Sequence, residues 1–386
     1  MAKVLFVIQR LGIGGSVTSL LNFLELLNQA GLKADLFVME HEGVFFERAA
    51  ECANILPENR KLAAVICEPE KLRKYGMRGL IHRCVYSLQY KFRDVSKVRN
   101  QLFEEAANCI GEYDIAVAYS EGTATVFTQY IRSKKKIAWV HTIYERFVKN
   151  VQSSEMQKLY SRFEKIVCVA PAAAEAFKKG LPALNNKVCM IPNPLNAERI
   201  KEQSKVSLSF GLNEESNIII SVGRLSPEKQ YDLAILAAQK LNESGVPFKW
   251  YIIGDGSERK RLEDLIQATG LFDRVILVGM MGNPYPLIVR ADVLVISSLY
   301  EAQPMVANEA FILDVPVITT NYPSASTLVE HNVNGIICDM SVEGLYLAIK
   351  QFLTDVKYQN QLKKGARDFK YNSTEIVDTF LGMIDV

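Results

Sequence analysis

The chain has 386 residues, more than one hydrophobic core usually serves, so two domains of roughly 150–200 residues each are expected. Hydrophobic residues make up 49% and charged residues 23%, which is typical of a folded globular protein and excludes a disordered or coiled-coil chain. Forty-five Lys and Arg against forty-three Asp and Glu leave a formal charge of +2, too balanced to favour nucleic acid as a partner.

The seven cysteines are scattered without a C-x-x-C pair, and only four histidines accompany them. Reduced thiols are therefore expected, with no disulfide framework and no bound metal. The apolar run Val4–Ile8 is too short for a signal peptide, and nothing approaches the roughly 18 apolar residues that cross a bilayer. We expect a cytoplasmic protein, with contact at the inner face of the cell membrane left open.

Short β-branched runs alternate with helical patterns along the whole chain. The first half has strand candidates at Lys3–Ile8, Lys33–Met39, Asp114–Tyr119, Lys136–Val140, Lys165–Val169 and Val188–Ile191. The second half has them at Asn217–Val222, Lys249–Ile253, Arg274–Val278, Asp292–Ile296, Val315–Thr319 and Gly335–Cys338. Helical spacing of apolar residues lies between, at Val17–Ala30, Lys229–Asn242 and Ser257–Thr269 among others. The alternation predicts an α/β fold with parallel sheets covered on both faces.

Two prolines within Ile191-Pro192-Asn193-Pro194 stop regular structure where the two series of strands meet. This predicts a Rossmann-like domain over residues 1–193 and a second over 194–370. A C-terminal helix within 371–386 is expected to pack back on the first domain. Ligands bind beyond the carboxyl ends of strands in such sheets, so two doubly wound domains would face each other across a central cleft.

A glycine loop, Gly12-Ile13-Gly14-Gly15-Ser16, joins the first strand to its helix. Gly14 and Gly15 would let the backbone approach an acceptor or a phosphate at a helix N-terminus. A plain structural turn is the simpler alternative. A dehydrogenase fingerprint is a third, with Glu40 as the acid on the ribose, but Val17 occupies the third glycine position of that motif.

The corresponding loop of the second half, Gly223-Arg224-Leu225-Ser226-Pro227-Glu228-Lys229, carries two cations at a helix N-terminus. The helix dipole disfavours positive charge there, so Arg224 and Lys229 indicate a docked anion such as a diphosphate. A solvated surface pair is the alternative. Gly254 and Gly256 mark a similar strand–glycine–helix junction, which is weak evidence by itself.

The segment from Ser297 to Ala310 places Glu301 in a loop before a helix that Pro304 begins. Glu309 falls inside that helix among apolar residues, so it is expected to be buried and to need hydrogen-bond partners such as ribose hydroxyls. Eight helical residues rise about 12 Å, more than the roughly 5–9.5 Å between paired glycosidase carboxylates. Separate binding roles therefore fit better than a hydrolytic pair.

Taken together, Glu301 and Glu309 with seven residues between them, G-R-L-S-P-E-K, I-P-N-P, I-I-G-D-G and N-G-I-I-C-D resemble glycosyltransferase family 4. The likeness covers most of the second half and, in the first, mainly the glycine loop and the segment at His141. It implies a retaining enzyme of the GT-B fold. It also implies a nucleotide-diphosphate sugar as co-substrate, with no further cofactor and no metal.

The resemblance assigns catalysis to Glu301, Arg224, Lys229 and His141, and donor binding to Glu309, Gly223, Gly254, Gly256, Met280, Met281, Ala302, Gln303, Pro304, Met305 and Val306. Arg224 and Lys229 would hold the diphosphate, Glu309 the ribose and Glu301 the transferred sugar, with the base near Met280 and Met281. The usual glycine after the first glutamate is Ala302 here, and Thr142 follows His141 where Asp is frequent. These departures bear on which sugar is transferred.

Residues Lys71 to Asn100 carry nine Lys or Arg and one acid, Asp94, with apolar residues interleaved. The pattern is typical of a basic amphipathic surface that meets anionic lipid, and equally of a solvated helix pair. Lys134-Lys135-Lys136 is expected to be a polar turn. The sequence thus predicts transfer of a hexosyl group from a nucleotide sugar, with UDP the expected nucleotide, to a glycan or lipid-linked acceptor in surface polysaccharide synthesis. A non-catalytic sugar-nucleotide or glycan binding protein is the alternative.

Overall fold

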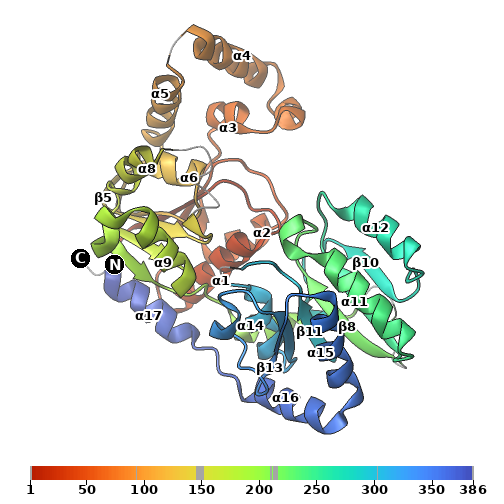
Figure 1. Cartoon of the computed structure of the whole chain (residues 1–386). Helices are drawn as coiled ribbons and strands as arrows, with labels where there is room; N and C mark the ends of the chain where they lie inside the picture. Colours follow the sequence, from red (N-terminus) through yellow and green to blue (C-terminus); the bar gives the residue numbers. More distant parts are fainter. Residues whose placement is uncertain are drawn as a thin grey trace. The chain divides into compact units, whose positions relative to one another are not determined.

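The computed structural model of the chain (Figure 1) describes residues 2–92, 94–144, 152–208, 211, 216–301 and 303–384, with the backbone alone at 90–92 and 95. It contains two compact units. The first domain comprises Met1–Pro194 with Ser373–Val386, and the second comprises Leu195–Asn372. Each is an α/β domain around one parallel sheet, so the predicted fold class is confirmed.

The first domain has a seven-stranded sheet in the order β3-β2-β1-β4-β5-β6-β7. Its strands are β1 (Val4–Ile8), β2 (Asp35–Val38), β3 (Asn54–Ile55), β4 (Glu112–Ala118), β5 (Arg132–Val140), β6 (Lys165–Cys168) and β7 (Val188–Met190). The helices are α1 (Gly15–Gln29), α2 (Phe46–Cys52), α3 (Arg60–Ile66), α4 (Gly76–Phe92), α5 (Val95–Ala107), α6 (Thr123–Thr128), α8 (Ser153–Tyr160), α9 (Pro171–Gly180) and α17 (Ser373–Ile384), with 3-10 turns η1 (Pro69–Tyr75) and η2 (Pro182–Lys187).

The second domain has a six-stranded sheet in the order β10-β9-β8-β11-β12-β13. Its strands are β8 (Asn217–Val222), β9 (Phe248–Ile253), β10 (Val275–Gly279), β11 (Val293–Ile296), β12 (Val317–Thr320) and β13 (Gly335–Cys338). The helices are α10 (Ala197–Gln203), α11 (Tyr231–Glu243), α12 (Arg259–Ala268), α13 (Tyr285–Ile288), α14 (Met305–Ile312), α15 (Val342–Thr354) and α16 (Val356–Asp368), with 3-10 turns η3 (Pro227–Lys229) and η4 (Ala325–Thr327).

The expected turn at Lys134–Lys136 is wrong, because all three lysines lie within β5, where Lys135 and Lys136 pair with Ile115 and Ala116 of β4. The first half of β5 is exposed or half-buried. The aliphatic stems of the lysines therefore lie along the sheet, while their ammonium groups reach solvent or an acidic partner. Lys134 Nζ, for instance, lies 2.8 Å from Asp114 Oδ1. The sequence also missed β3, which pairs with β2 over only two residues.

Both sheets reverse their strand order at one point. In the first sheet, β1, β2 and β3 follow one another toward one edge, and β4 then pairs with the free side of β1. In the second sheet, β8, β9 and β10 do the same, and β11 then pairs with the free side of β8. Ligands of doubly wound sheets bind at this switch point, beyond the carboxyl ends of the two central strands. The loops after β1 and β4, and after β8 and β11, are therefore the places to seek a site.

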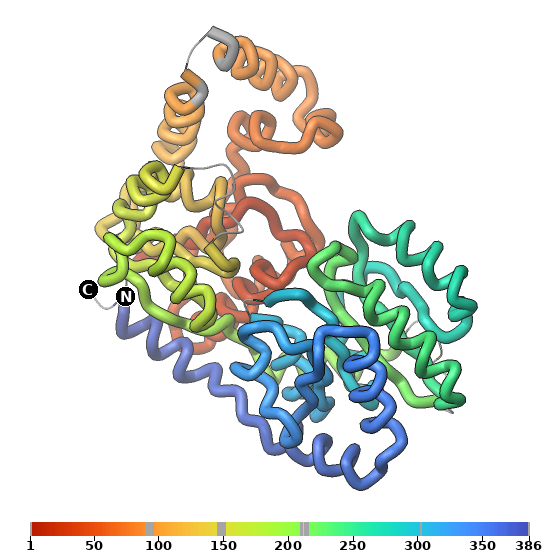
Figure 2. The backbone as a smooth tube through the Cα atoms, in the orientation of Figure 1, coloured from red at the N-terminus to blue at the C-terminus, as the bar shows by residue number. Residues whose placement is uncertain are grey.

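Helix α17 completes the core of the first domain. The chain returns from the second domain and lays α17 beside α1, as the blue end of the tube in Figure 2 shows. The Phe380 ring is fully buried, 5.0 Å from the ring centre of Phe23, 5.9 Å from Phe6 and 6.0 Å from Trp139. Residues far apart in sequence thus share one aromatic cluster.

Candidate active site

The loop after β8 holds the two predicted phosphate cations. Its chain turns through η3, and Gln230 adopts a left-handed conformation with φ of +46° before α11 begins at Tyr231. The helix therefore starts two residues later than predicted, because Gln230 interrupts the helical path. Arg224 is exposed, and within the described part of the chain its guanidinium has no ion-pair partner. It is available to an anion.

Lys229 and Glu301 meet directly. Lys229 Nζ donates to Glu301 Oε1 at 2.5 Å, and Ser298 Oγ donates to the same oxygen at 2.7 Å. Both charged side chains are largely covered, at 23% and 14% exposure. The second carboxylate oxygen of Glu301 has no hydrogen-bond partner among the residues that the structure describes. Sequence reasoning had given these residues separate roles and did not foresee their contact.

This pair lies at the switch point of the second sheet. Ser298 and Glu301 follow β11, while Lys229 follows β8, the neighbouring strand. Backbone contacts lock the two loops together, because Leu299 N donates to Glu228 O and Ser297 Oγ donates to Lys229 O. A small hollow at this point is lined by both charged side chains. The arrangement can present a cation and a carboxylate to one ligand.

Three predicted glycines support this loop through close backbone contacts. A methyl group on Gly254, where φ is +146°, would lie 1.8 Å from the Gly223 carbonyl oxygen, and one on Gly256 would lie 2.3 Å from that of Leu225. A methyl group on Gly223 would come within 2.9 Å of the Tyr231 hydroxyl. These glycines therefore let the ends of β8 and β9 pack together. Their predicted contact with a donor remains a prediction.

Glu309 is buried in α14, as its apolar neighbours predicted, with 7% exposure. Tyr285 Oη donates to Glu309 Oε1 at 3.1 Å, so the protein supplies one partner that the sequence had assigned to ribose hydroxyls. Helix α14 begins at Met305, with Pro304 at its N-cap and Val306 in its first turn. Gln303 precedes them, and Ala302 lies outside the described residues.

The segment that was predicted to lie near the nucleotide base of the donor follows β10. Met280 is 62% exposed, whereas Met281 is partly buried against the core that includes α14. Gly254 N donates to Gly279 O, which ties this segment to the end of β9. An exposed methionine next to the end of β9 can offer an apolar surface to a planar ring.

In the first domain, the glycine loop opens α1. Gly14 is the N-cap and Gly15 the first helical residue, and a methyl group on Gly14 would touch nothing. The sequence missed Gly43, whose φ is +124° and where a methyl group would lie 2.0 Å from the Leu11 carbonyl oxygen. The loop after β2 is thus laid directly over the end of β1.

Glu40 is too deeply buried to reach the ribose of a dinucleotide. It is 1% exposed, and its Oε1 accepts hydrogen bonds from Gln9 Nε2 at 2.8 Å and Arg10 Nε at 3.0 Å. Val17, where that motif has its third glycine, is buried in α1. Both features weigh against the dehydrogenase alternative.

His141 follows β5, with an oxygen close to each ring nitrogen. Nε2 lies 3.0 Å from the Tyr119 carbonyl oxygen, and Nδ1 lies 3.1 Å from Asn193 Oδ1. Ser19 Oγ donates to the same Asn193 oxygen at 2.9 Å. The single N–H of a neutral imidazole donates to one of these two oxygens, and this contact restricts the orientation of the ring. The contact of His141 with the donor sugar stays a prediction.

Glu121, which the sequence did not single out, positions this segment. It follows β4, and its Oε1 accepts the backbone N–H groups of His141 at 2.6 Å and Thr142 at 2.7 Å. Asn193 belongs to the I-P-N-P junction, so the sequence signal was present there and was interpreted only as a domain boundary. No local pattern marked Glu121, Tyr119 or Ser19, because their partners are distant in sequence.

The stability of the chain should depend on pH through His141. Burial lowers the pKa of this imidazole, and the nearby Glu121 charge opposes the shift with a smaller effect. The unfolded state then binds the proton more readily, so stability is full above the unfolded pKa of about 6.5 and falls as the pH drops below it. In His141→Asn, we expect a flatter decline of Tm between neutral and mildly acidic pH.

Thermal unfolding across this pH range measures the effect. His82→Asn is the matched control, because His82 is exposed on α4. Equal Tm slopes in wild type and His141→Asn would show that His141 does not contribute this dependence. His41, whose pKa burial also lowers, accounts for residual slope in the variant.

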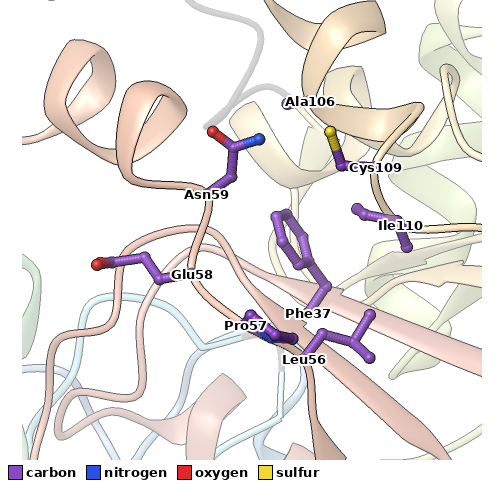
Figure 3. A pocket seen from close by; sticks show the side chains of 8 residues that line it. All are labelled: Phe37, Leu56, Pro57, Glu58, Asn59, Ala106, Cys109 and Ile110. Atoms are coloured by element: carbon purple, nitrogen blue, oxygen red, sulfur yellow. The ribbon is translucent and has the colours of Figure 1, made fainter.

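A larger cavity of about 210 Å³ lies elsewhere in the first domain (Figure 3). Its walls include Phe37 of β2 and Ile110 beyond α5, and its polar lining groups are engaged within the protein. Glu58 accepts from Tyr75 Oη, and Asn59 Oδ1 caps α3 by accepting from Leu62 N. None of the predicted site residues lines it.

The described residues contain no group of three or more His, Cys, Asp or Glu side chains placed to hold a metal ion. No helix among them is both long and apolar enough to cross a membrane.

Two Rossmann-like domains in series, each with a switch point at its central strands, define the class of GT-B glycosyltransferase folds. The two halves of the chain match two family models of glycosyltransferases. The family described as Glycosyltransferase Family 4 matches residues 13–199, and that described as Glycosyl transferases group 1 matches residues 202–369.

Curated relatives are glycosyltransferases by name. An uncharacterized glycosyltransferase of Methanocaldococcus jannaschii is 28% identical over 48% of this chain and 48% of its own length. An Escherichia coli UDP-Gal:alpha-D-GlcNAc-diphosphoundecaprenol alpha-1,3-galactosyltransferase is 26% identical over 69% of this chain and 73% of its own. The chain spans about half to two thirds of the length of the first relatives it matches.

Solved structures share the fold over the whole chain. The Anabaena protein HepE in complex with UDP-glucose superposes with a TM-score of 0.75 at 19% identity, covering 100% of this chain and 99% of that one.

Proposed function

We propose that the chain transfers a hexosyl residue from a UDP-sugar to a glycan or lipid-linked acceptor, with retention of the anomeric configuration and without a metal. The contact that carries this proposal is the pairing of Lys229 with Glu301 at the switch point of the second sheet, beside an exposed Arg224. A ligand with a diphosphate and a sugar has the groups that such a set would bind. The family matches give the reaction class.

The two cations would act on the diphosphate. Arg224 is a planar, permanently charged donor that suits two phosphate oxygens, and Lys229 supplies a compact charge. Negative charge grows on the leaving diphosphate as the glycosidic bond breaks. Preoriented cations stabilise that charge more than they stabilise the bound substrate, which is the condition for faster turnover.

The two glutamates would take separate parts of the donor. The second oxygen of Glu301 is open to a hydroxyl of the transferred sugar, while the first remains with Lys229 and Ser298. Glu309, already oriented by Tyr285, would accept from the ribose. With the leaving group held on one face, an acceptor hydroxyl that enters on the same face preserves the configuration.

UDP is favoured as the nucleotide because HepE was solved with UDP-glucose. A lipid-linked acceptor is supported by the E. coli relative, whose name includes a diphosphoundecaprenol acceptor. In the first domain, Gly14, Gly15 and the ring of His141 would form the acceptor side. All seven cysteines are free thiols, which supports a reducing compartment such as the cytoplasm.

A panel of UDP-, GDP- and ADP-sugars, read by thermal shift, tests the donor. We expect stabilisation by UDP-sugars in wild type, because a ligand that binds only the folded state raises Tm. Glu309→Gln should raise the donor KM about tenfold with little change in kcat, since it loses a charged acceptor for the ribose. Arg224→Ala should lower kcat as well.

Glu343→Gln is the control, because Glu343 is an exposed, ion-paired carboxylate of the same domain. Full activity of both site variants at limiting donor would remove this site assignment. Nucleotide-sugar binding without any transfer or donor hydrolysis, tested with a range of acceptors, would favour the non-catalytic binding protein.

A further inference from the structure

Helix α4 turns its apolar side away from the protein. Five large hydrophobic side chains on it are between 44% and 72% exposed: Met77, Leu80, Ile81, Val85 and Leu88. Cys84, also exposed, lies among them. The described chain has exposed hydrophobic side chains elsewhere, but these follow one another along a single helix.

These residues form one continuous stripe. Positions 77, 80, 81, 84, 85 and 88 follow an i, i+3, i+4 pattern, which places them on one face of the helix. The opposite face meets the protein: a methyl group on Gly79 would lie 2.3 Å from Tyr75 Cβ and 3.3 Å from Ala64 Cβ, so α4 packs closely there. An amphipathic helix normally buries its apolar side, so this one lacks a partner.

In the basic stretch from Lys71 to Asn100, some cationic side chains are engaged within the protein and others are exposed. Lys71 is bound to Glu42 and Glu68, and Arg83 Nη1 donates to the Cys67 carbonyl oxygen. Arg73 and Arg78 are exposed, and Arg78 stands beside the stripe. Arg93 lies outside the described residues, as does the side chain of Lys91. The sequence from Gly76 to Phe92 contains no acid.

We propose that the outward face of α4, defined by Met77, Leu80, Ile81, Cys84, Val85 and Leu88, docks on an anionic lipid surface. Arg78 lies beside this face on α4, and Arg73 is exposed on the preceding turn η1. The helix lies in the plane of the interface, with its apolar stripe in the acyl boundary and the arginines at the headgroups. The face deepens the proposed function, because it would bring the first domain to a lipid-linked acceptor. Docking itself requires no turnover.

Charge favours lipid over a second copy of the chain. Two α4 stripes packed on each other would bring Arg78 of both helices into one interface, and α4 has no carboxylate to pair with them. An anionic bilayer supplies the missing negative charge and also accepts the apolar stripe. The two occupants can be separated by experiment.

Co-sedimentation of the full chain with vesicles tests the proposal. We expect binding to phosphatidylglycerol–phosphatidylcholine vesicles that weakens with salt, and little binding to phosphatidylcholine alone. Ile81→Ser with Leu88→Ser should lower the vesicle affinity at least about tenfold, since apolar burial drives insertion. Arg78→Glu should weaken binding to anionic vesicles.

The chain offers matched controls. Phe272→Ser removes a similarly exposed hydrophobic side chain, at 67%, from the second domain and should leave vesicle binding unchanged. An environment-sensitive dye on Cys84, in a Cys109→Ser background, should shift to the blue on anionic vesicles. The same dye on Cys109, which is also exposed, in a Cys84→Ser background should not.

Three outcomes would overturn the proposal. One is the absence of binding to anionic vesicles at low salt. Another is sedimentation with vesicles while the Cys84 dye does not respond, since a different face would then be bound. The third is lipid-free dimers, seen by sedimentation velocity, that Ile81→Ser with Leu88→Ser dissolves, together with no vesicle binding. Failure of transfer activity in wild type would instead contradict the proposed function and leave vesicle binding intact.

Discussion

Lys229→Met is expected to lower kcat/KM by roughly a hundred- to a thousandfold, the range seen when one preoriented group is removed from a developing negative charge. The side chain is held by Glu301 at 2.5 Å, so its charge is in place before any ligand arrives. Methionine keeps much of the lysine stem and removes the charge. Most of the loss should therefore fall on kcat, which reports stabilisation gained in the transition state.

Two further variants make this result specific. Lys240→Met removes a lysine that is ion-paired with Glu343 on the surface of the same domain, and it should retain activity. Glu301→Gln keeps a side chain that can accept from Lys229 and Ser298, so it should preserve Tm while activity falls. Wild-type kcat in Lys229→Met, measured with saturating donor, would contradict a role for this cation in leaving-group departure.

Phe380→Ala is expected to destabilise the first domain by about 3–5 kcal/mol, as large-to-small changes at fully buried aromatic positions do. The ring contacts Phe6, Phe23 and Trp139, and no solvent reaches it. Its removal leaves a cavity among three large side chains that cannot easily collapse. Since α17 is the last helix, loss of its anchor should also detach the C-terminal segment.

The chain's two tryptophans allow each domain to be followed separately. Trp139 is buried in the first domain and Trp250 in the second. In a Trp250→Phe background, denaturant unfolding followed by Trp139 fluorescence should shift to lower denaturant when Phe380→Ala is added. In a Trp139→Phe background, the transition followed by Trp250 should move little. Equal shifts of both transitions would mean that α17 stabilises the whole chain and not the first domain.

The secondary structure of this protein was largely predictable, for a physical reason. Strands of a parallel sheet are buried on both faces, so they appear as continuous apolar runs, and Asn217–Val222 and Gly335–Cys338 were predicted at their observed bounds. The failures had no such run. Asn54–Ile55 is too short to show a pattern, and the lysines of β5 concealed a strand whose outer part is only partly covered.

The candidate site was half predictable. Arg224, Lys229 and Glu301 stand in loops and turns with recognisable local chemistry, and Glu309 stands out as a charge within an apolar helix, so the sequence could nominate each of them. It could not show that Tyr285 already orients Glu309, because that contact joins residues of two different helices. The same limit hid Glu121, which holds backbone groups after β5.

The amino-acid sequence by itself determined the α/β class, the family and the nature of the charged groups, since these depend on local periodicity and residue type. The tertiary structure decided which groups meet. Lys229 and Glu301 are 72 positions apart in sequence. They become neighbours because β11 pairs directly with β8, although β9 and β10 lie between these two strands along the chain. It also decided the direction of α4. A helix with one apolar face can point it inward or outward, and only the packing at Gly79 turned that face toward solvent.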